Sequence, residues 1–113
     1  GRVGPGWDQI GKRTVKYDYQ SLLEKLEERP LDYFKMFYAD TALFGSRAGT
    51  VCGLDFFGVD KTVFASDAPF DPEGGTMYIR ETIKVIDSLD ISEEDRKKIY
   101  HDNAVELMKL TGI

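Results

Sequence analysis

The residues of this chain that are best placed for chemistry follow a short apolar run. Thr62–Ala65 is β-branched and aromatic, which predicts a buried strand, and Ser66 and Asp67 come directly after it. Pro69 then ends the strand, because proline has no N–H for a ladder. Ligands and catalytic groups of α/β folds sit at the carboxyl ends of the strands, so the Asp67 carboxylate is placed for chemistry. The alternative is that Asp67 only caps a turn.

The elements before this strand are predicted from caps and spacing. Residues 1–16 are rich in glycine and lack periodicity, which predicts a loop. Asp18 can cap a helix whose apolar residues fall at helical spacing, and Pro30 ends that helix. The next apolar run, Phe34–Ala39, is short and aromatic and predicts a strand that ends at Asp40.

The remaining helices carry their own start signals. Ser46 opens a helix through Phe57, with Cys52 on its buried side. A helix from Thr76 to Leu89 presents one isoleucine face, made by Ile79, Ile83 and Ile86. Two shorter helices follow, one started by the capping box at Ser92–Asp95 and one capped by Asp102 or Asn103.

The order of these elements predicts an α/β fold with parallel strands, because helices separate the two strands. A parallel sheet is apolar on both faces and needs cover on both sides, and two strands cannot provide a complete sheet. We therefore expect residues 1–113 to be the C-terminal part of one larger domain, with no internal boundary. The alternative is a standalone, non-catalytic α/β module whose open sheet edges pair with a partner chain.

Composition argues against several classes of protein. The net charge of −5 and the pI near 4.8 argue against a nucleic-acid surface. No apolar run approaches the roughly 20 residues of a membrane span. Cys52 has no second cysteine to pair with, which favours a reducing, cytoplasmic setting. The chain begins without methionine, which suggests a piece of something longer.

Several segments together resemble a known family. They are Phe37–Ala42 (FYADTA), Gly58–Lys61 (GVDK), Val63–Phe70 (VFASDAPF), and Asn103-Ala104 followed by Leu107. In order and spacing they resemble the closing third of the amidohydrolase superfamily, in the branch that contains aminocarboxymuconate-semialdehyde decarboxylase and γ-resorcylate decarboxylase. The resemblance implies the last two β/α units of a (β/α)8 TIM-like barrel, incomplete in this chain, with extra C-terminal helices. The strands near Phe37 and Val63 would be the seventh and eighth.

The resemblance also implies a catalytic role and a cofactor. Asp67 matches the family's aspartate that binds a catalytic divalent metal, here expected to be zinc, and that takes part in proton transfer. A bound metal lowers the pKa of water, and a carboxylate beside it can move that proton. The implied enzyme is a metal-dependent hydrolase or carboxy-lyase, and its implied substrate is a small aromatic or conjugated carboxylic acid.

The chain departs from the family pattern in its histidines. A catalytic zinc site takes about three protein ligands, which the family supplies partly from a His-x-His pair, and this chain has only His101. The missing ligands are therefore expected in an N-terminal part of the barrel that this sequence lacks. His101 itself is expected to be a residue at a helix end. Without that part, we expect the chain to form homo-oligomers.

Four further residues are predicted to surround Asp67. Asp40 and Thr41 would line the substrate pocket or support it, or would only make strand-end hydrogen bonds. Ser66 is expected to give a supporting hydrogen bond, and Phe70 to lie over the barrel mouth. The following Gly74-Gly75 pair would either let this loop move or form the turn that admits the next helix.

Overall fold

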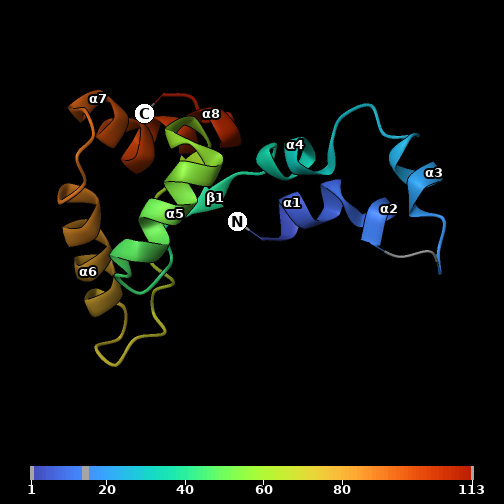
Figure 1. Cartoon of the computed structure of the whole chain (residues 1–113). Helices are drawn as coiled ribbons and strands as arrows, with labels where there is room; N and C mark the ends of the chain where they lie inside the picture. The colour runs from blue at the N-terminus through green and yellow to red at the C-terminus, as the bar shows by residue number, and fades with distance from the viewer. Residues whose placement is uncertain (1, 14–15, 113) are drawn as a thin grey trace. The chain divides into compact units, whose positions relative to one another are not determined.

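The computed structural model describes residues 2–13 and 16–112, and the chain divides into two compact units, residues 1–37 and 38–113 (Figure 1). Within the described residues, the first unit consists of short helices and the turns between them, with no strand. It contains α1 (Val3–Asp8), α2 (Ile10–Arg13), α3 (Tyr19–Leu23) and α4 (Pro30–Lys35). The second unit holds the two strands and the remaining helices. None of the helices in the described ranges is long and apolar enough to cross a membrane.

The first unit differs from the predicted loop over residues 1–16. Helices α1 and α2 form there, and residues 1, 14 and 15 of that predicted loop lie outside the described residues. Tertiary contacts outweigh the weak helical propensity of glycine. Gly4 is buried, and a Cβ on it would lie only 2.5 Å from the Leu31 side chain. Asp8 also accepts a hydrogen bond of 2.9 Å from the Leu31 N–H, so α1 is tied to α4.

Pro30 begins a helix instead of ending one, because the preceding helix, α3, already ends at Leu23. Asp18 caps α3 as predicted, because its carboxylate accepts the Ser21 N–H at 3.0 Å. Pro30 then stands in the first turn of α4, where its fixed φ suits a helix and its missing N–H costs nothing. The predicted strand Phe34–Ala39 is therefore wrong over most of its length, because α4 continues to Lys35.

The two strands pair in parallel, as predicted. β1 (Ala39–Asp40) lies beside β2 (Thr62–Val63), with Ala39 opposite Thr62 and Asp40 opposite Val63. Both strands are short, because the helical residues up to Lys35 shorten the first and side-chain contacts replace ladder contacts beyond Val63. The mixture of helices with a small parallel sheet confirms an α/β fold.

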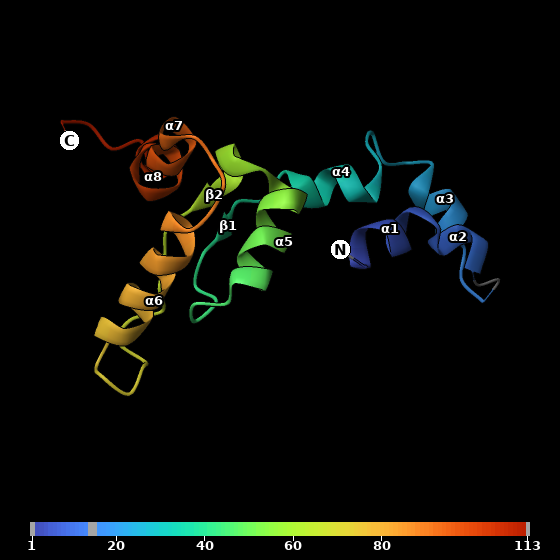
Figure 2. The same cartoon turned by 60° about the vertical axis from the view of Figure 1, so that its left-hand side comes forward.

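The outer edge of β2, away from β1, is covered by the C-terminal helices (Figure 2). The Val63 carbonyl accepts the Thr41 N–H at 3.2 Å, so Val63 faces β1. The backbone groups of its neighbours in the chain, Thr62 and Phe64, therefore point to the other edge. There the Phe64 N–H donates to the Ile99 carbonyl at 2.9 Å, and the Asn103 amide donates to the Thr62 carbonyl at 2.7 Å. The expectation of an open edge is therefore wrong at these two positions.

Asn103 is consequently not a helix cap. The chain runs from α7 (Glu93–Lys97) through the π-helical turn η2 (Lys98–Asp102) into α8 (Asn103–Met108) without a break. Neither Asp102 nor Asn103 caps α8 through its side chain: Asp102 makes no cap hydrogen bond, and Asn103 donates to two carbonyls of the second unit, those of Val59 and Thr62.

The other predicted helices are confirmed. Ser46 caps α5 (Arg47–Phe57) by accepting the Gly49 N–H, and Ser92 caps α7 by accepting the Asp95 N–H. The turn η1 (Val59–Lys61) joins α5 to β2. Helix α6 (Thr76–Asp87) lies where it was predicted, and Arg96 of α7 donates to the Ile86 and Leu89 carbonyls at its C-terminal end.

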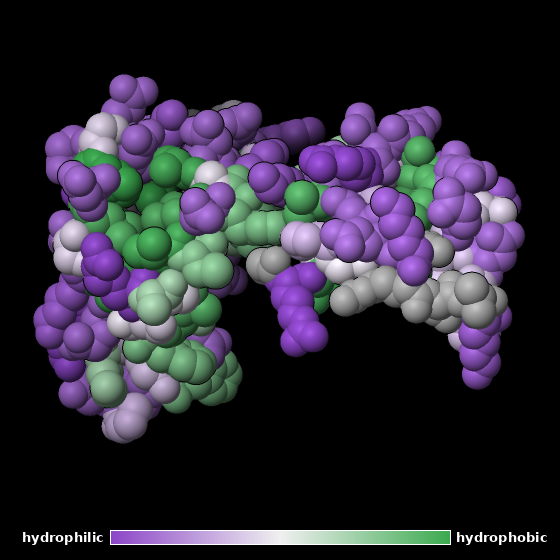
Figure 3. Space-filling view, viewed as in Figure 1, coloured by the Kyte–Doolittle hydropathy of each residue, from purple (hydrophilic) through white to green (hydrophobic). Residues whose placement is uncertain are grey.

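The buried faces of these helices differ from those expected. The buried apolar side chains of the described residues are Val85, Ile86, Leu89 and Ile99. Ile79 and Ile83, expected on the buried face of α6, are each 38% exposed. Cys52, expected on the buried side of α5, is exposed as well. Within the second unit, hydrophobic surface is visible over α5 (Figure 3).

Candidate functional site

Asp67 lies just beyond β2, where the sequence placed it. Its backbone adopts a left-handed conformation, with φ of 64°, which costs an ordinary residue energy but which aspartate tolerates better than most. The Asp67 carbonyl accepts the Phe70 N–H at 3.2 Å, so residues 67–70 form a tight turn. The Asp67 residue is exposed on this turn. A carboxylate presented in this way can bind a cation or exchange a proton with a ligand.

Ser66 supports the same turn from inside. It is buried, and its hydroxyl accepts the Ala68 N–H at 3.3 Å. The predicted supporting hydrogen bond is therefore present, and it is made to the backbone. Among the described residues no histidine stands beside this hydroxyl to activate it, since His101 pairs with Asp102 at 2.8 Å.

Thr41 continues the β1–β2 ladder with its side chain. The hydroxyl donates to the Ala65 carbonyl at 2.8 Å and accepts the Ala65 N–H at 3.0 Å. Thr41 is only 2% exposed. Of the two alternatives stated for this residue, the structure has the strand-end hydrogen bonds. These bonds fix the backbone of Ala65, directly before Ser66 and Asp67.

Asp40 and Phe70 are both exposed. The Asp40 carboxylate accepts the Ala42 N–H at 2.9 Å, which is a local turn at the end of β1. Phe70 is 78% exposed, an unusual degree for an aromatic ring of this size. The structure thus leaves Asp67, Asp40 and Phe70 accessible and uses Thr41 and Ser66 to hold the backbone beneath them.

Asp71 was not singled out from the sequence, and it is the buried carboxylate of this region. It is 8% exposed and accepts the Glu73 N–H at 2.7 Å and the Tyr78 N–H at 3.1 Å. Burial raises the pKa of the Asp71 carboxyl, but four backbone N–H groups within residues 73–78, Tyr78 first among them, lower this pKa by more, so it lies below its usual 3.8. The Asp-Pro dipeptide at this position is a turn signal that could have revealed it.

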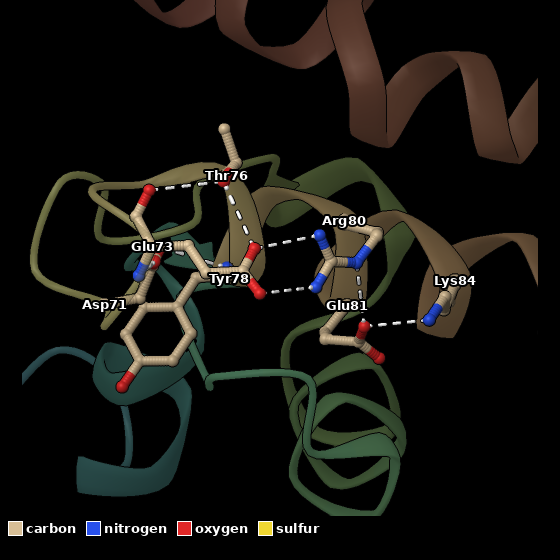
Figure 4. A network of polar contacts seen from close by, with 7 residues as sticks. All are labelled: Asp71, Glu73, Thr76, Tyr78, Arg80, Glu81 and Lys84. Atoms are coloured by element: carbon tan, nitrogen blue, oxygen red, sulfur yellow. Dashed lines mark hydrogen bonds and ion pairs between the residues drawn. The ribbon is translucent and has the colours of Figure 1, made fainter.

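A chain of ion pairs continues from this loop along α6 (Figure 4). Glu73 forms two hydrogen bonds with the Arg80 guanidinium, at 3.0 and 3.3 Å. Arg80 also contacts Glu81 at 3.2 Å, and Lys84 contacts the same Glu81 oxygen at 2.8 Å. The Arg80 hydrogen bond is the main reason that the pKa of Glu73 lies below its usual range. These pairs join the end of the loop to the exposed face of α6.

The loop after β1 packs on the same helix. The rings of Phe44 and Tyr78 stack with centroids 4.5 Å apart. A Cβ on Gly45 would lie 2.7 Å from the Glu81 Cβ, so the backbone at residue 45 runs directly against α6. Both loops at the carboxyl ends of the two strands are thus fixed to the first half of α6.

The described residues do not form a complete metal site. No three histidine, cysteine, aspartate or glutamate side chains within residues 2–13 and 16–112 come together in a group that could hold a metal ion. Asp67 offers one carboxylate, whereas a catalytic zinc takes about three protein ligands. The residues present in this chain therefore do not fit such a metal by themselves.

The sequence was compared with known families and with curated proteins. The family model described as amidohydrolase matches residues 4–110, which is nearly the whole chain. The chain therefore belongs to the amidohydrolase family, a family of hydrolase-like enzymes that typically bind a divalent metal. No curated protein matches the chain in the sequence comparison.

Proposed function

We propose that this chain is the C-terminal segment of a metal-dependent enzyme, a hydrolase or decarboxylase, that acts on a small aromatic or conjugated carboxylic acid. The observation that carries the proposal is the position of Asp67: in a chain that belongs to the amidohydrolase family, an exposed carboxylate stands four residues after a parallel strand. Strand ends of this kind hold the catalytic groups of α/β barrels. One cysteine without a second suits a reducing compartment, so we place the enzyme in the cytoplasm.

In this proposal β1 and β2 are the seventh and eighth strands of a (β/α)8 barrel whose other strands lie outside this sequence. The small core supports it, because apolar residues of α5 and α6 such as Val51, Ile79 and Ile83 remain exposed. Helices of a barrel bury such faces against the sheet. The part of the barrel outside this sequence would cover them.

Within the site, Asp67 would exchange a proton with the substrate or with bound water and would offer one oxygen to the metal. The remaining ligands, expected to be histidines, would come from the other strands of the barrel, and zinc is the metal we expect. Phe70 would lie against the substrate, because an exposed aromatic ring can stack on an aromatic or conjugated acid.

The test is a pair of substitutions in the full-length enzyme. Asp67→Asn keeps the shape of the side chain but removes its charge and its proton-accepting oxygen, so we expect turnover to fall by about 10²–10⁴-fold with the fold intact. Asp40→Asn is the matched control, an exposed aspartate at the end of the neighbouring strand, and should have a much smaller effect. Metal content is measured alongside and should fall only in the Asp67 variant. Near-normal turnover in the purified Asp67→Asn protein would refute the assignment.

A separate observation tests the proposed origin of the chain. The gene upstream of Gly1 is read for a His-x-His pair and two later histidines. An in-frame start at this point without such upstream sequence would favour the alternative, a non-catalytic module that works by association with a partner chain.

A further inference from the structure

Asp71 is a buried carboxylate that the proposed chemistry does not use. It follows the exposed Asp67–Phe70 turn directly, yet it is 8% exposed and turned inward onto backbone N–H groups. A buried charge is costly unless it is hydrogen-bonded, and here backbone donors supply the bonds. The burial of this carboxylate therefore calls for a structural reason.

The first part of the explanation is the start of α6. The residue at the N-cap is Gly75, which has no side chain to accept a hydrogen bond. Asp71 caps the helix instead: one of its carboxylate oxygens accepts the N–H of Tyr78, seven residues further on in the first turn of α6. The other oxygen accepts the N–H of Glu73 in the loop. One carboxylate thus fixes both the loop backbone at Glu73 and the first turn of α6.

The second part is that the loop closes on itself. Gly75 has φ of 115°, and a Cβ there would lie 3.1 Å from the Ala68 Cβ and 3.3 Å from the Pro69 Cα. The two ends of the loop are therefore in contact, and Gly75 serves close approach. Of the two alternatives given for the Gly74-Gly75 pair, this contact favours the turn that admits α6.

A second and weaker interaction also joins the loop to α6, on the surface of the protein. The Glu73–Arg80 ion pair joins the loop to α6, but both side chains are about half exposed (Figure 4). Exposed ion pairs contribute little, so the inner carboxylate holds the loop and the outer pair only supports it. The whole turn that precedes these anchors, Asp67–Phe70, is exposed.

We propose that Asp71 is a positioning residue that holds the Asp67–Phe70 turn in place over the site. This inference rests on the proposed function, because it assigns Asp71 to the reaction that Asp67 would serve. Asp71 touches neither substrate nor reacting atoms; it acts through the loop backbone. Displacement of a catalytic group by about 1 Å can cost about 100-fold in rate, so a loop anchor of this kind affects turnover strongly.

The test uses Asp71→Asn in the full-length enzyme. The amide keeps the shape but turns one acceptor into a donor that faces a backbone N–H, which unlocks the loop. We expect faster hydrogen exchange at the Glu73 and Tyr78 amides, a fall in kcat of about 10–100-fold and a rise in KM, all measured well below the unfolding temperature. Asp90→Asn, an exposed aspartate just after α6, is the matched control and should change none of these.

Two comparisons separate positioning from a merely structural role. A structural role lowers the melting temperature but leaves kcat per folded molecule and KM unchanged, and that result would overturn the inference. Glu73→Gln removes only the outer ion pair and should alter kcat by less than about threefold. If Asp71→Asn fails to fold, Gly75→Ala displaces the same loop from its other end and must reproduce the kcat loss.

The outcomes also separate this inference from the proposed function. Full turnover in Asp67→Asn would refute the proposed function. Loss of turnover in Asp67→Asn together with unchanged kcat and KM in Asp71→Asn would leave the proposed function standing and overturn the role of Asp71.

Discussion

Three buried threonines allow one interaction to be measured against two internal controls. Thr41, Thr50 and Thr82 are 2%, 6% and 2% exposed, and each can be changed to valine, which keeps the volume and removes the hydroxyl. The hydroxyls differ only in what they contact. Differences among the three variants therefore report hydrogen bonding rather than packing.

The Thr41 hydroxyl makes two bonds, both to the backbone of Ala65, at 2.8 and 3.0 Å. A hydrogen bond contributes about 0.5–1.5 kcal/mol net, and a buried group left without its partner costs about 1–3 kcal/mol. Ala65 is only partly buried, so the free N–H and carbonyl regain some water. We expect Thr41→Val to lower the free energy of unfolding by about 2–3 kcal/mol.

The two controls set the scale. The Thr50 hydroxyl donates to the Ser46 carbonyl, which also accepts the Thr50 N–H, so Thr50→Val leaves no carbonyl unpaired and should cost about 0.5–1 kcal/mol. The Thr82 hydroxyl is buried and has no partner among the described residues. Thr82→Val should therefore be neutral or stabilising, by up to about 1 kcal/mol.

The assay is urea unfolding of the full-length protein and its three variants, supported by melting temperatures. One kcal/mol shifts the melting temperature of a domain of 150–250 residues by about 2–4 °C, so Thr41→Val should lose about 5–10 °C. The expected order of stability is Thr82→Val, then Thr50→Val, then Thr41→Val. A Thr41→Val protein as stable as the Thr50→Val protein would refute the reasoning that the hydroxyl completes the ladder.

Three further predictions concern acid, the isolated chain and the covered strand edge. The pKa of Asp71 is lowered in the fold, so its contribution to stability is present above about pH 3.8 and is lost as the pH falls below that value. Between about pH 5 and about pH 3, the melting temperature should therefore fall more steeply with decreasing pH for the unmodified enzyme than for Asp71→Asn. An equal fall in the two proteins would contradict this. Residues 1–113 alone should self-associate in sedimentation and bind zinc much more weakly than the full-length enzyme, because one carboxylate is too few ligands, and a monomer with a tightly held zinc would contradict both. Asn103→Ala should lower stability by about 2 kcal/mol in urea unfolding, because it leaves the Val59 and Thr62 carbonyls without the amide donor, whereas the exposed Gln20→Ala should change it by less than about 0.5 kcal/mol.

The sequence predicted those parts of the fold that depend on near neighbours. Ser46 and Ser92 marked true helix starts, because a cap bonds to a residue three positions on. The parallel pairing followed from a helix lying between two apolar runs. Asp67 was correctly placed after its strand, while its role in the site stays a prediction.

The features that the sequence did not predict depend on distant contacts. The Asn103 amide reaches a carbonyl 41 positions earlier, and the Thr41 hydroxyl bonds to a residue 24 positions later. Local spacing carries no trace of such partners, so Asn103 read as a cap. The prediction for Pro30 was wrong for another reason: proline often follows the end of a helix, but it also suits the first turn of one, and here it has only the second role.

The cover over the outer edge of β2 also determines where another strand can join. The Phe64 N–H and the Thr62 carbonyl already pair with Ile99 and Asn103, so a parallel neighbour could not use these two backbone groups. Ile99 of η2 and Asn103 therefore restrict the positions of β2 with which such a strand could pair, and so its register. A chain that ended before Lys98 would lack both Ile99 and Asn103. The outer edge of β2 would then expose unpaired backbone groups, which are a template for pairing with other chains. A stop codon ahead of the codon for Lys98 would thus be expected to cause aggregation through β2, a strand that is encoded more than 30 residues earlier.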